Sequence, residues 1–324
     1  FKNSPTYRPN LYDLLAHKAV DFFVNVNPEL PEPPEPFQLT ADMGFAPSAE
    51  FSQLRFPTKD EGNRLRQAIL IFQELVAYHL ANNSDPTPLI DVELQRLEFA
   101  NRYIQGEDKD EKYLQALRAL IKRGGETPIV AEVRYHIARM WDEQANRYNQ
   151  GQNPDYRYHR QKAKDYADET IREFRGSRGA QLSGNLVQNM LRKSIDAKVE
   201  NVTLADQEFR FWFQYRNIDQ IYIRLIPAKL EWQNEYDSEK QIKRLLDITP
   251  AAEWNERLKA ADDLQLHSTE IAAPALKAGT YALLISTTGE FDKKTSQFSL
   301  TFFQNTQLSV FTRQSPSRDL EVYV

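Results

Sequence analysis

The alternating residues between positions 208 and 227 constrain the fold of this chain more than any other stretch. Aromatic and polar side chains alternate over residues 209–216, and aliphatic and polar side chains alternate over residues 220–226. A period of two is typical of β-strands that bury one face. Asn217 and Asp219 lie between the two runs and favour a turn. The segment therefore predicts two strands joined as a hairpin by a tight turn.

The hydrophobic period changes near Ser194. Before that residue, apolar side chains recur every three or four positions, which is typical of amphipathic helices, and after it the period is two. Asn10 is placed to cap the first helix, and Thr127 followed by Pro128 is typical of a helix start. Helices are expected over residues 10–25, 60–80, 89–104, 111–121, 127–141, 156–174 and 180–191.

Small residues lie on several of the expected helix stripes, among them Ala131, Ala138, Ala163 and Ala167. Alanine allows two antiparallel helices to approach closely. The pattern is similar to α–α hairpins of the tetratricopeptide type, although no strict period of about 34 residues can be traced. We therefore expect an array of helical hairpins in the first part of the chain.

A proline-rich segment interrupts the helical part early. Five prolines lie within residues 27–36 and favour extended polyproline geometry over helix. The segment could serve as a ligand for a proline-recognising domain, but a stiff linker along the surface is the commoner role. The region is expected to stay irregular to residue 60, with anchoring side chains at Phe37, Phe45, Phe51 and Phe56.

The second part of the chain has the pattern of an antiparallel β-sandwich, because it contains several short strands with alternating faces. A helical insertion over about residues 237–258 is expected to cover an edge or an end of a sheet. Strands are expected near residues 196–204, 208–216, 220–227, 267–273, 279–287, 297–303, 307–312 and 319–324.

Composition excludes some classes of function. The 41 basic and 46 acidic residues give a net charge of −5, which argues against a nucleic-acid footprint. The chain has no cysteine, which excludes disulfides, thiolate metal sites and cysteine nucleophiles. No run of about 18 apolar residues is present, so no membrane span is expected. The first residue is Phe and the last residues resemble an unfinished strand, so we expect a piece of a longer protein.

Residues that could carry chemistry form no recognisable site. His17, His79, His136, His159 and His267 have no zinc-ligand spacing. For His79 and His136 we expect packing roles, because both lie on or beside apolar helix faces. No nucleotide-binding or nucleophile-elbow motif is present. We therefore predict no catalytic, cofactor-binding or metal-binding residues, no cofactor and no enzymatic activity, and leave the binding residues unassigned.

Four further patterns have a chemical interpretation and a structural one. Asp262 and Asp263 could act as a carboxylate pair, but a solvated turn is expected. The acidic run 107–111 lacks the pattern of a calcium loop and is expected to open a helix. The segment 176–179 could bind an anion at a helix N-terminus, but a helix break is expected. The basic and aromatic residues 156–160 could stack on bases, although the acidic total argues against this.

Four segments resemble the N-terminal region of large bacterial α2-macroglobulin-like proteins. The segments are Leu11-Tyr-Asp-Leu-Leu-Ala-His-Lys-Ala-Val-Asp-Phe-Phe23, the helical stretch ending in Phe174-Arg-Gly-Ser-Arg-Gly-Ala180, Tyr215-Arg-Asn-Ile-Asp-Gln-Ile-Tyr-Ile-Arg-Leu225 and Leu276-Lys-Ala-Gly-Thr-Tyr-Ala-Leu-Leu284. The resemblance implies a helical domain over residues 1–193, with the proline-rich extended segment at 27–60, and a macroglobulin-like sandwich over residues 194–324. It also implies export to the periplasm or cell envelope, with a lipid anchor outside this chain in some members.

The resemblance makes a non-catalytic scaffold role the leading hypothesis, in protease trapping (endopeptidase inhibition) or envelope defence. The implied partners are proteins, either proteases or other domains of the same chain. The thioester motif of some family members is absent, because the chain has no cysteine. Two alternatives remain: an independent helical-repeat adaptor, and a carbohydrate- or peptide-binding accessory module. Exposed tryptophans test the carbohydrate alternative, because no sugar platform remains among Trp212, Trp232 and Trp254 if all three are buried.

Overall fold

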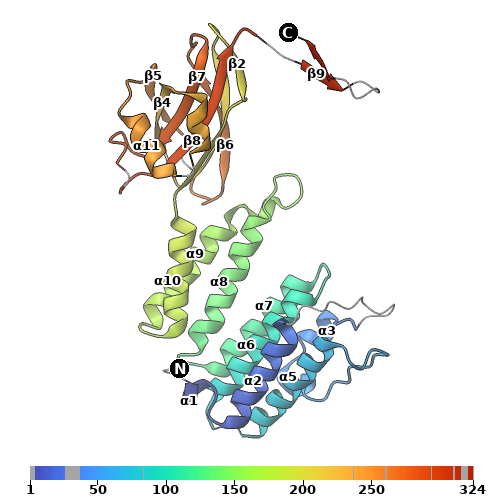
Figure 1. Ribbon diagram of the computed structural model, residues 1–324. Coiled ribbons are helices and arrows are strands. Elements are labelled where there is room, and N and C mark those ends of the chain that lie inside the picture. Colours follow the sequence, from blue (N-terminus) through green and yellow to red (C-terminus); the bar gives the residue numbers. More distant parts are fainter. Residues whose placement is uncertain are drawn as a thin grey trace. The chain divides into compact units, whose positions relative to one another are not determined.

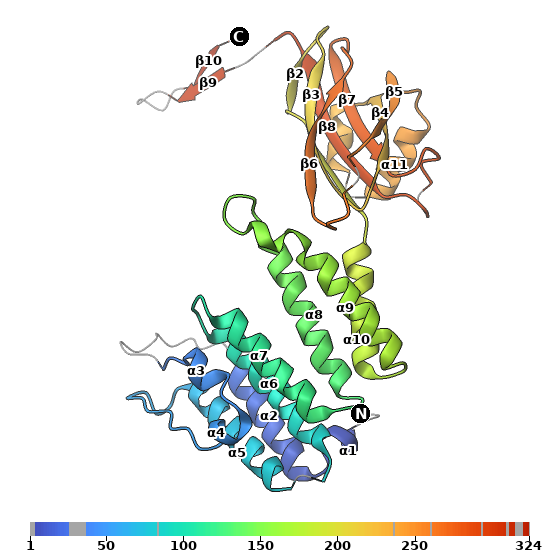
Figure 2. The same cartoon turned by 180° about the vertical axis from the view of Figure 1, so that it is seen from behind.

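A computed structural model describes residues 4–25, 37–82, 84–235, 237–259, 261–292, 294–308, 311–314 and 320–323. The chain divides into two compact units. The helical unit comprises residues 1–148 and 162–188, and the strand unit comprises residues 149–161 and 189–324. The expected combination of helices and mainly antiparallel strands is confirmed (Figures 1 and 2). The segment 27–36 lies outside the described residues.

The helical unit is built from consecutive helices that pack on one another: α2 on α5, α5 on α6, α6 on α7 and α7 on α8. Aromatic and aliphatic side chains such as Phe51, Phe72 and Leu75 form its core. The helices of the chain before the first strand are α1 (Ser4–Tyr7), α2 (Leu11–Asn25), α3 (Ala41–Gly44), α4 (Ser48–Phe51), α5 (Arg64–Ala81), α6 (Pro86–Tyr103), α7 (Lys109–Gly124), α8 (Val130–Asn146), η1 (Pro154–Tyr158), α9 (His159–Glu173) and α10 (Arg178–Leu191). Of these, η1, the start of α9 and the end of α10 belong to the strand unit.

Local capping residues determine where several of these helices begin. Asn10 accepts a hydrogen bond from the backbone N–H of Asp13, as expected for a cap. α5 begins later than expected, because Asn63 accepts hydrogen bonds from the backbone of the first turn. α8 begins at Val130 and not at Thr127, whose hydroxyl instead donates to the carbonyl of Gly124.

The segment 37–60 is not irregular throughout, contrary to expectation. It contains the short helices α3 and α4, and the Thr40 side chain caps the first of them. The four expected anchors are buried: Phe37, Phe45, Phe51 and Phe56 are 8%, 7%, 0% and 3% exposed. Burial of these rings holds the segment against the helices, which allows short helical turns to persist.

The strand unit contains two sheets that share one core. The three-stranded sheet has the order β1-β3-β6, and the five-stranded sheet has the order β2-β8-β7-β4-β5. All neighbouring strands are antiparallel except β2 and β8, which are parallel. The strands are β1 (Ser194–Lys198), β2 (Val202–Leu204), β3 (Phe209–Arg216), β4 (Gln220–Pro227), β5 (Ala252–Arg257), β6 (His267–Ala273), β7 (Gly279–Ser286) and β8 (Phe298–Thr306); β9 (Phe311–Gln314) pairs with β10 (Leu320–Tyr323).

The expected hairpin at 208–227 is wrong. Both strands form, but β3 pairs with β1 and β6, whereas β4 pairs with β5 and β7. The connection crosses from one sheet to the other, with Ile218 buried in the shared core and Asn217 in the left-handed region at φ 56°. Both strands direct their odd-numbered side chains into that core, so alternation alone fits either arrangement.

The expected helical insertion at 237–258 is correct only in its first half. α11 (Ser238–Leu246) is capped by the Asp237 side chain, and residues 252–257 form the edge strand β5. The helix covers a face of the five-stranded sheet and not an edge, because Ile242 and Leu245 pack with Ile226, Ala282 and Leu284. β7 is therefore buried on both of its faces.

Candidate functional site

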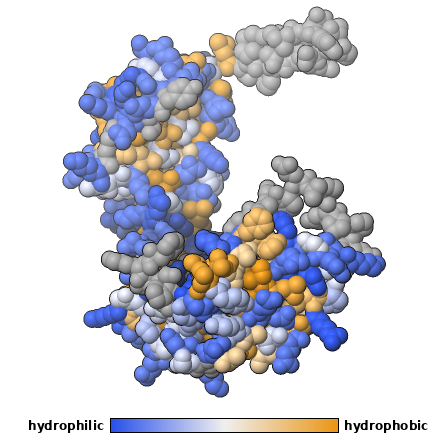
Figure 3. Space-filling view, turned by 60° about the horizontal axis from the view of Figure 1, so that its bottom comes forward, coloured by the Kyte–Doolittle hydropathy of each residue, from blue (hydrophilic) through white to orange (hydrophobic). Residues whose placement is uncertain are grey.

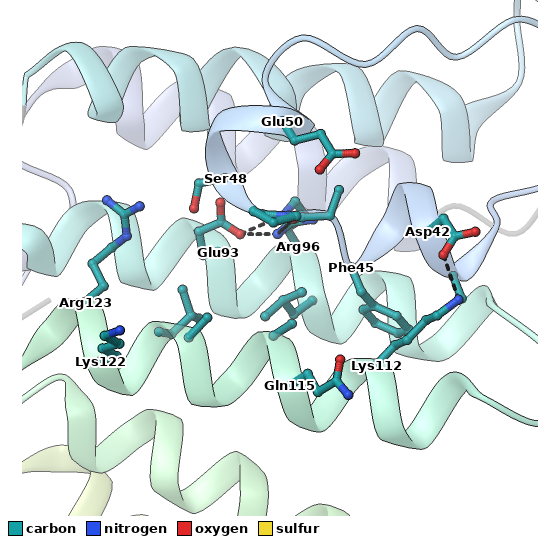
Figure 4. Close-up of a pocket in the computed structure, with 17 residues that line it drawn as sticks. Asp42, Phe45, Ser48, Glu50, Glu93, Arg96, Lys112, Gln115, Lys122 and Arg123 are labelled. Carbon is teal, nitrogen blue, oxygen red and sulfur yellow. Dashed lines mark hydrogen bonds and ion pairs between the residues drawn. The ribbon is translucent and has the colours of Figure 1, made fainter.

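The helical unit contains an open groove of about 730 Å³ (Figure 4). One wall is α7, the other is the segment that carries α3 and α4, and α6 contributes the floor. This volume lies within the range of small-molecule and peptide pockets, roughly 300–1,000 Å³. The groove is therefore large enough to accept a short segment of another chain.

A buried ion pair on α6 supports the floor of the groove. Arg96 and Glu93 are 2% and 0% exposed, and Nε of Arg96 lies 2.7 Å from Oε2 of Glu93. Arg96 also donates to the carbonyls of Gly44 (2.7 Å) and Ala46 (3.1 Å), and its guanidinium lies 4.2 Å from the ring centre of Phe51. One arginine thus fixes the segment that carries α3 and α4 to the centre of α6.

Gly44 allows that segment to approach α6 closely. A Cβ atom at this position would lie 2.5 Å from Cδ1 of Ile104 and 2.9 Å from Cβ of Ala100. Such distances are shorter than van der Waals contact, so a larger residue would displace the wall of the groove. The carbonyl of Gly44 is also one of the acceptors for Arg96.

The groove has unequal charges along its length. At one end, Lys112 of α7 is neutralised by Asp42 at 2.7 Å and Asp108 at 2.6 Å. At the other end, Lys122 and Arg123 are exposed and form no ion pair with any described residue. Between these ends the groove is lined by Phe45, Ala46, Leu97, Ala116, Ala119 and Leu120. Ala119 is exposed and Ala116 is half-buried, whereas the other four side chains are buried beneath the groove.

The groove also contains a polar group without a partner. Oε1 of Glu93 is buried and has no hydrogen-bond partner among the described residues. Buried polar atoms are nearly always satisfied, so this oxygen is a candidate acceptor for a bound donor. Ser48 also lines the groove and is buried. Together these residues support recognition of a ligand that carries N–H groups.

A second polar cluster lies among α2, α5 and α6. His79 Nε2 lies 2.7 Å from Asp13 Oδ1, and His17 Nδ1 lies 2.9 Å from the Gln95 amide oxygen. The expected packing role of His79 is confirmed, because it is 4% exposed. Burial lowers the pKa of His17 to about 4, which keeps its imidazole neutral near pH 7.

Asp91 lies between this cluster and α1. It accepts a hydrogen bond from Gln95 at 2.9 Å, and Arg8 lies 3.8 Å away. Burial raises the pKa of Asp91 to about 6, and Arg8 opposes the shift. Nearby, the Glu132 carboxylate accepts a hydrogen bond from the Tyr7 hydroxyl at 2.5 Å. These contacts attach α1 to the bundle and lie outside the groove.

In the strand unit, three regions that the sequence presented separately come together. Asp263 is 1% exposed and lies 2.8 Å from His267 Nε2 and 3.0 Å from Arg157 Nε. The expected solvated turn is therefore correct for Asp262 and wrong for Asp263. Burial favours a higher pKa for Asp263, but the hydrogen bonds from Gln265, His267 and Arg157 outweigh it and hold the pKa below its ordinary value.

This cluster fixes the segment 149–161 to the sandwich. Arg160 donates to the carbonyl of Leu264 at 3.0 Å, and the Gln265 amide donates to the carbonyl of Arg157 at 2.9 Å. The cationic side chains of segment 156–160 therefore make structural contacts. The small hollow beside them, about 300 Å³, is lined in part by Tyr215 and His267.

The remaining sequence candidates have structural positions. The acidic run 107–111 spans the start of α7, as expected. A helix break lies between α9 and α10, as expected, with Gly176 at φ 81°, but Arg178 and Gly179 are already the first residues of α10. His136 is 8% exposed and lies 3.4 Å from Glu98, which confirms its packing role, and His159 is half-buried at the start of α9.

Three tryptophans of the strand unit are neither fully exposed nor fully buried. Trp212, Trp232 and Trp254 are all half-buried, and the last two pack against the sandwich clusters. On the outer face of β3, Arg210 is exposed and forms an ion pair with Glu270 at 3.4 Å. Each ring therefore keeps part of its surface open, and the carbohydrate alternative stays a hypothesis.

Apolar side chains also reach the surface of the helical unit (Figure 3). Leu11, Leu15 and Phe22 of α2 are 67%, 59% and 61% exposed. Within the part of the chain that the structure describes, no set of three or more candidate ligands could hold a metal ion. No helix there combines the length and hydropathy required to cross a membrane.

Sequence reasoning did not identify the groove. One signal was available, because Asp91, Glu93 and Arg96 interrupt an otherwise apolar run on α6. Charged residues at positions that face a core are expected to be paired, and that expectation points to buried partners. The position of Lys122 and Arg123 beside the same floor depends on how α7 packs.

Comparison with known proteins gives little guidance. No family model and no curated protein matches the chain. Among solved structures, the CARDB domain of a Pyrococcus furiosus protein, described as a complex with di-metal ions, is similar at 9% identity with a TM-score of 0.21. The match covers 36% of this chain and 93% of that one, and a TM-score this low carries no argument about fold or function.

Proposed function

We propose that this chain is a non-catalytic N-terminal module of an exported α2-macroglobulin-like protein. In this proposal the helical unit, with hairpins of the tetratricopeptide type, binds protein partners, and the sandwich is the first macroglobulin-like domain. The partners are proteases or other domains of the same protein, and the location is the periplasm or cell envelope. The proposed role is scaffolding in protease trapping or envelope defence.

The groove is the observation that supports a binding role. It combines a small apolar surface at Ala116 and Ala119, two cations without an ion pair among the described residues at Lys122 and Arg123, and a wall held in place by Arg96. Binding sites commonly combine apolar surface with a few placed polar groups. A wall fixed by buried hydrogen bonds reduces the entropy lost when a partner binds.

Site-specific photo-crosslinking tests the binding role. Ala119 is exposed in the groove and is replaced by a photoreactive phenylalanine analogue. The variant is expressed as full-length protein in the organism that naturally produces it. The matched control carries the analogue at Ala81, which is exposed at the end of α5 and outside the groove. We expect a crosslinked protein, or a crosslink within the chain, from position 119 alone. Absence of any crosslink at 119, or equal crosslinking at 81, would contradict the proposal.

The macroglobulin-like part needs a separate test. Purified full-length protein is incubated with a broad-specificity protease and separated by size. We expect the protease to co-elute with the protein while it still cleaves small peptides. If the protease elutes alone, protease trapping is wrong. The binding role of the groove would not be affected by that result, because the crosslinking experiment tests it separately.

A further inference from the structure

We infer that the groove binds an extended peptide with a carboxylate at the end of α7 marked by Lys122 and Arg123. The inference rests on the proposed binding role of the groove and adds the chemistry and direction of its ligand. Four features of the groove carry it: its charge distribution, its length, its unpaired acceptor and its apolar surface.

The charge distribution gives the ligand a direction. Lys112 at one end is neutralised by two carboxylates, whereas Lys122 and Arg123 at the other end have no ion pair among the described residues. Glu50 on the opposite wall is also exposed and unpaired within the same range of described residues. A ligand with a carboxylate next to Lys122 and Arg123, and without a second acid near Glu50, is therefore complementary.

The length of the groove sets the size of the ligand. Lys112 and Lys122 are ten positions apart on α7, which corresponds to about 15 Å at a helical rise of roughly 1.5 Å per residue. An extended chain advances about 3.3 Å per residue. The groove thus accommodates about four or five residues of an extended peptide.

The unpaired acceptor favours an extended backbone over a helix. Oε1 of Glu93 is buried without a hydrogen-bond partner among the described residues, and Glu93 contributes to the groove. An extended peptide has backbone N–H groups available along its length, whereas a helix has free N–H groups only in its first turn. The oxygen has no accessible surface in the structure, so a backbone N–H of the ligand would satisfy it once the Glu93 carboxylate turns toward the groove.

The apolar surface accepts the side chains between the two ends. Ala116, which is half-buried, and Ala119, which is exposed, give α7 a low apolar profile above the buried Leu97 and Leu120. Short side chains on the wall allow the ligand backbone to approach α7. The ligand class is therefore a peptide of four or five residues with an apolar centre and one carboxylate end.

Selection from random peptide libraries tests the inference. Seven-residue random peptides are displayed in two formats, one with a free C-terminus and one embedded in a loop, and each is selected on the 324-residue protein. We expect enrichment of apolar peptides that end in a free carboxylate in the first format, or that carry Asp or Glu at one end in the second. The enriched format identifies whether a chain end or an acidic side chain supplies the carboxylate.

Charge reversal locates the bound peptide. Dissociation constants of the enriched peptides are measured by fluorescence anisotropy on wild type, K122E/R123E and the control K109E/R118E, which changes net charge equally outside the groove. We expect at least tenfold weaker binding to K122E/R123E and less than a threefold change in the control. No enrichment in either format, or equal binding to K122E/R123E and wild type, would overturn the inference. A crosslink at position 119 in that case would leave the broader binding role standing.

Discussion

Replacement of Arg96 by methionine tests the argument that one buried arginine holds the groove together. Methionine retains much of the side-chain volume but removes every donor. The change leaves Glu93, which is 0% exposed, as a buried carboxylate without its counter-ion. It also removes the donors to the carbonyls of Gly44 and Ala46 and the contact with the Phe51 ring.

The magnitude follows from these contacts. Breaking a buried ion pair by removing one partner destabilises by about 3–5 kcal/mol. Each carbonyl that loses its donor adds about 1 kcal/mol or more. We therefore expect Arg96→Met to lower the free energy of unfolding of the helical unit by about 5 kcal/mol. Because whole domains are stable by about 5–15 kcal/mol, the variant should lie close to its unfolding threshold.

A double-mutant cycle separates the charge from the packing. In Glu93→Leu/Arg96→Met no buried charge remains at these two positions, and the carbonyls of Gly44 and Ala46 lack their donors. We expect the double variant to lose about 2–3 kcal/mol, which is less than Arg96→Met alone. Exposed Arg118→Met serves as the control and should change stability by less than about 0.5 kcal/mol.

Denaturant unfolding followed by helical circular dichroism measures the global effect, and hydrogen exchange with mass spectrometry measures the local one. We expect faster exchange over residues 41–51 in Arg96→Met than in the double variant. If the double variant loses as much stability as the two single variants together, the ion pair is not coupled and the account of the floor is wrong.

Three further changes test other parts of the structure. Gly179→Ala places a Cβ atom 2.1 Å from the backbone of Ala131, so it should lower the free energy of unfolding by at least about 1–3 kcal/mol. The control Gly184→Ala on the same helix meets no atom within 4 Å and should raise the free energy of unfolding by about 0.5–1 kcal/mol. Equal shifts of the melting temperature in the two variants would contradict the close contact at Gly179. Phe211→Asp buries an unpaired charge in the shared sandwich core and should abolish the β-sheet melting transition. The control Arg210→Ala changes an exposed residue on the same strand and should retain that transition. A cooperative β-sheet melt of Phe211→Asp would refute the expectation. The folded pKa of Asp91, about 6, lies above its ordinary value, so this carboxylate destabilises the fold above pH 6 and the penalty disappears as the pH falls towards 4. Asp91→Asn should therefore stabilise at pH 7.5 by up to about 3 kcal/mol and have little effect at pH 4, as denaturant titrations at the two values would show; a gain independent of pH would contradict the assignment.

The helical part was largely predictable because its signals are local. Helical periods, the cap at Asn10 and the break between α9 and α10 each depend on residues within a few positions of one another. Thr127 shows the limit of such signals, since its hydroxyl bonds backward to Gly124 and leaves Val130 to begin α8. The Thr127 hydroxyl bonds to the preceding Gly124 carbonyl and does not cap the next helix, so the start of α8 moves to Val130.

The first half of the insertion at 237–258 was also predictable, and the second half was not. Asp237 caps α11 through its side chain, which is a local signal. Trp254 and Leu258 continue the helical spacing, but residues 252–257 gain backbone hydrogen bonds from the open edge of β4. The available edge, which no local pattern reveals, overrode the periodicity.

The candidate site depended on contacts between distant positions. Glu93 and Arg96 are close in sequence, but the carbonyls that complete their environment come from Gly44 and Ala46. Asp263 and Arg157 are likewise far apart in the chain, and each has an unremarkable local context. Their burial could not be predicted because it results from packing of whole elements.

The segment 208–227 shows what the sequence determines and what the tertiary structure determines. Its sequence determined two strands and the faces that they bury, because side-chain alternation is a property of the extended backbone itself. Only the tertiary structure decided that β3 and β4 belong to different sheets, because strand partners are chosen by packing across the core. Ile218 fills that core at the crossing between the sheets. Hydrogen-bond partners and buried charges follow from the assembled fold, whereas period and capping are present in the sequence.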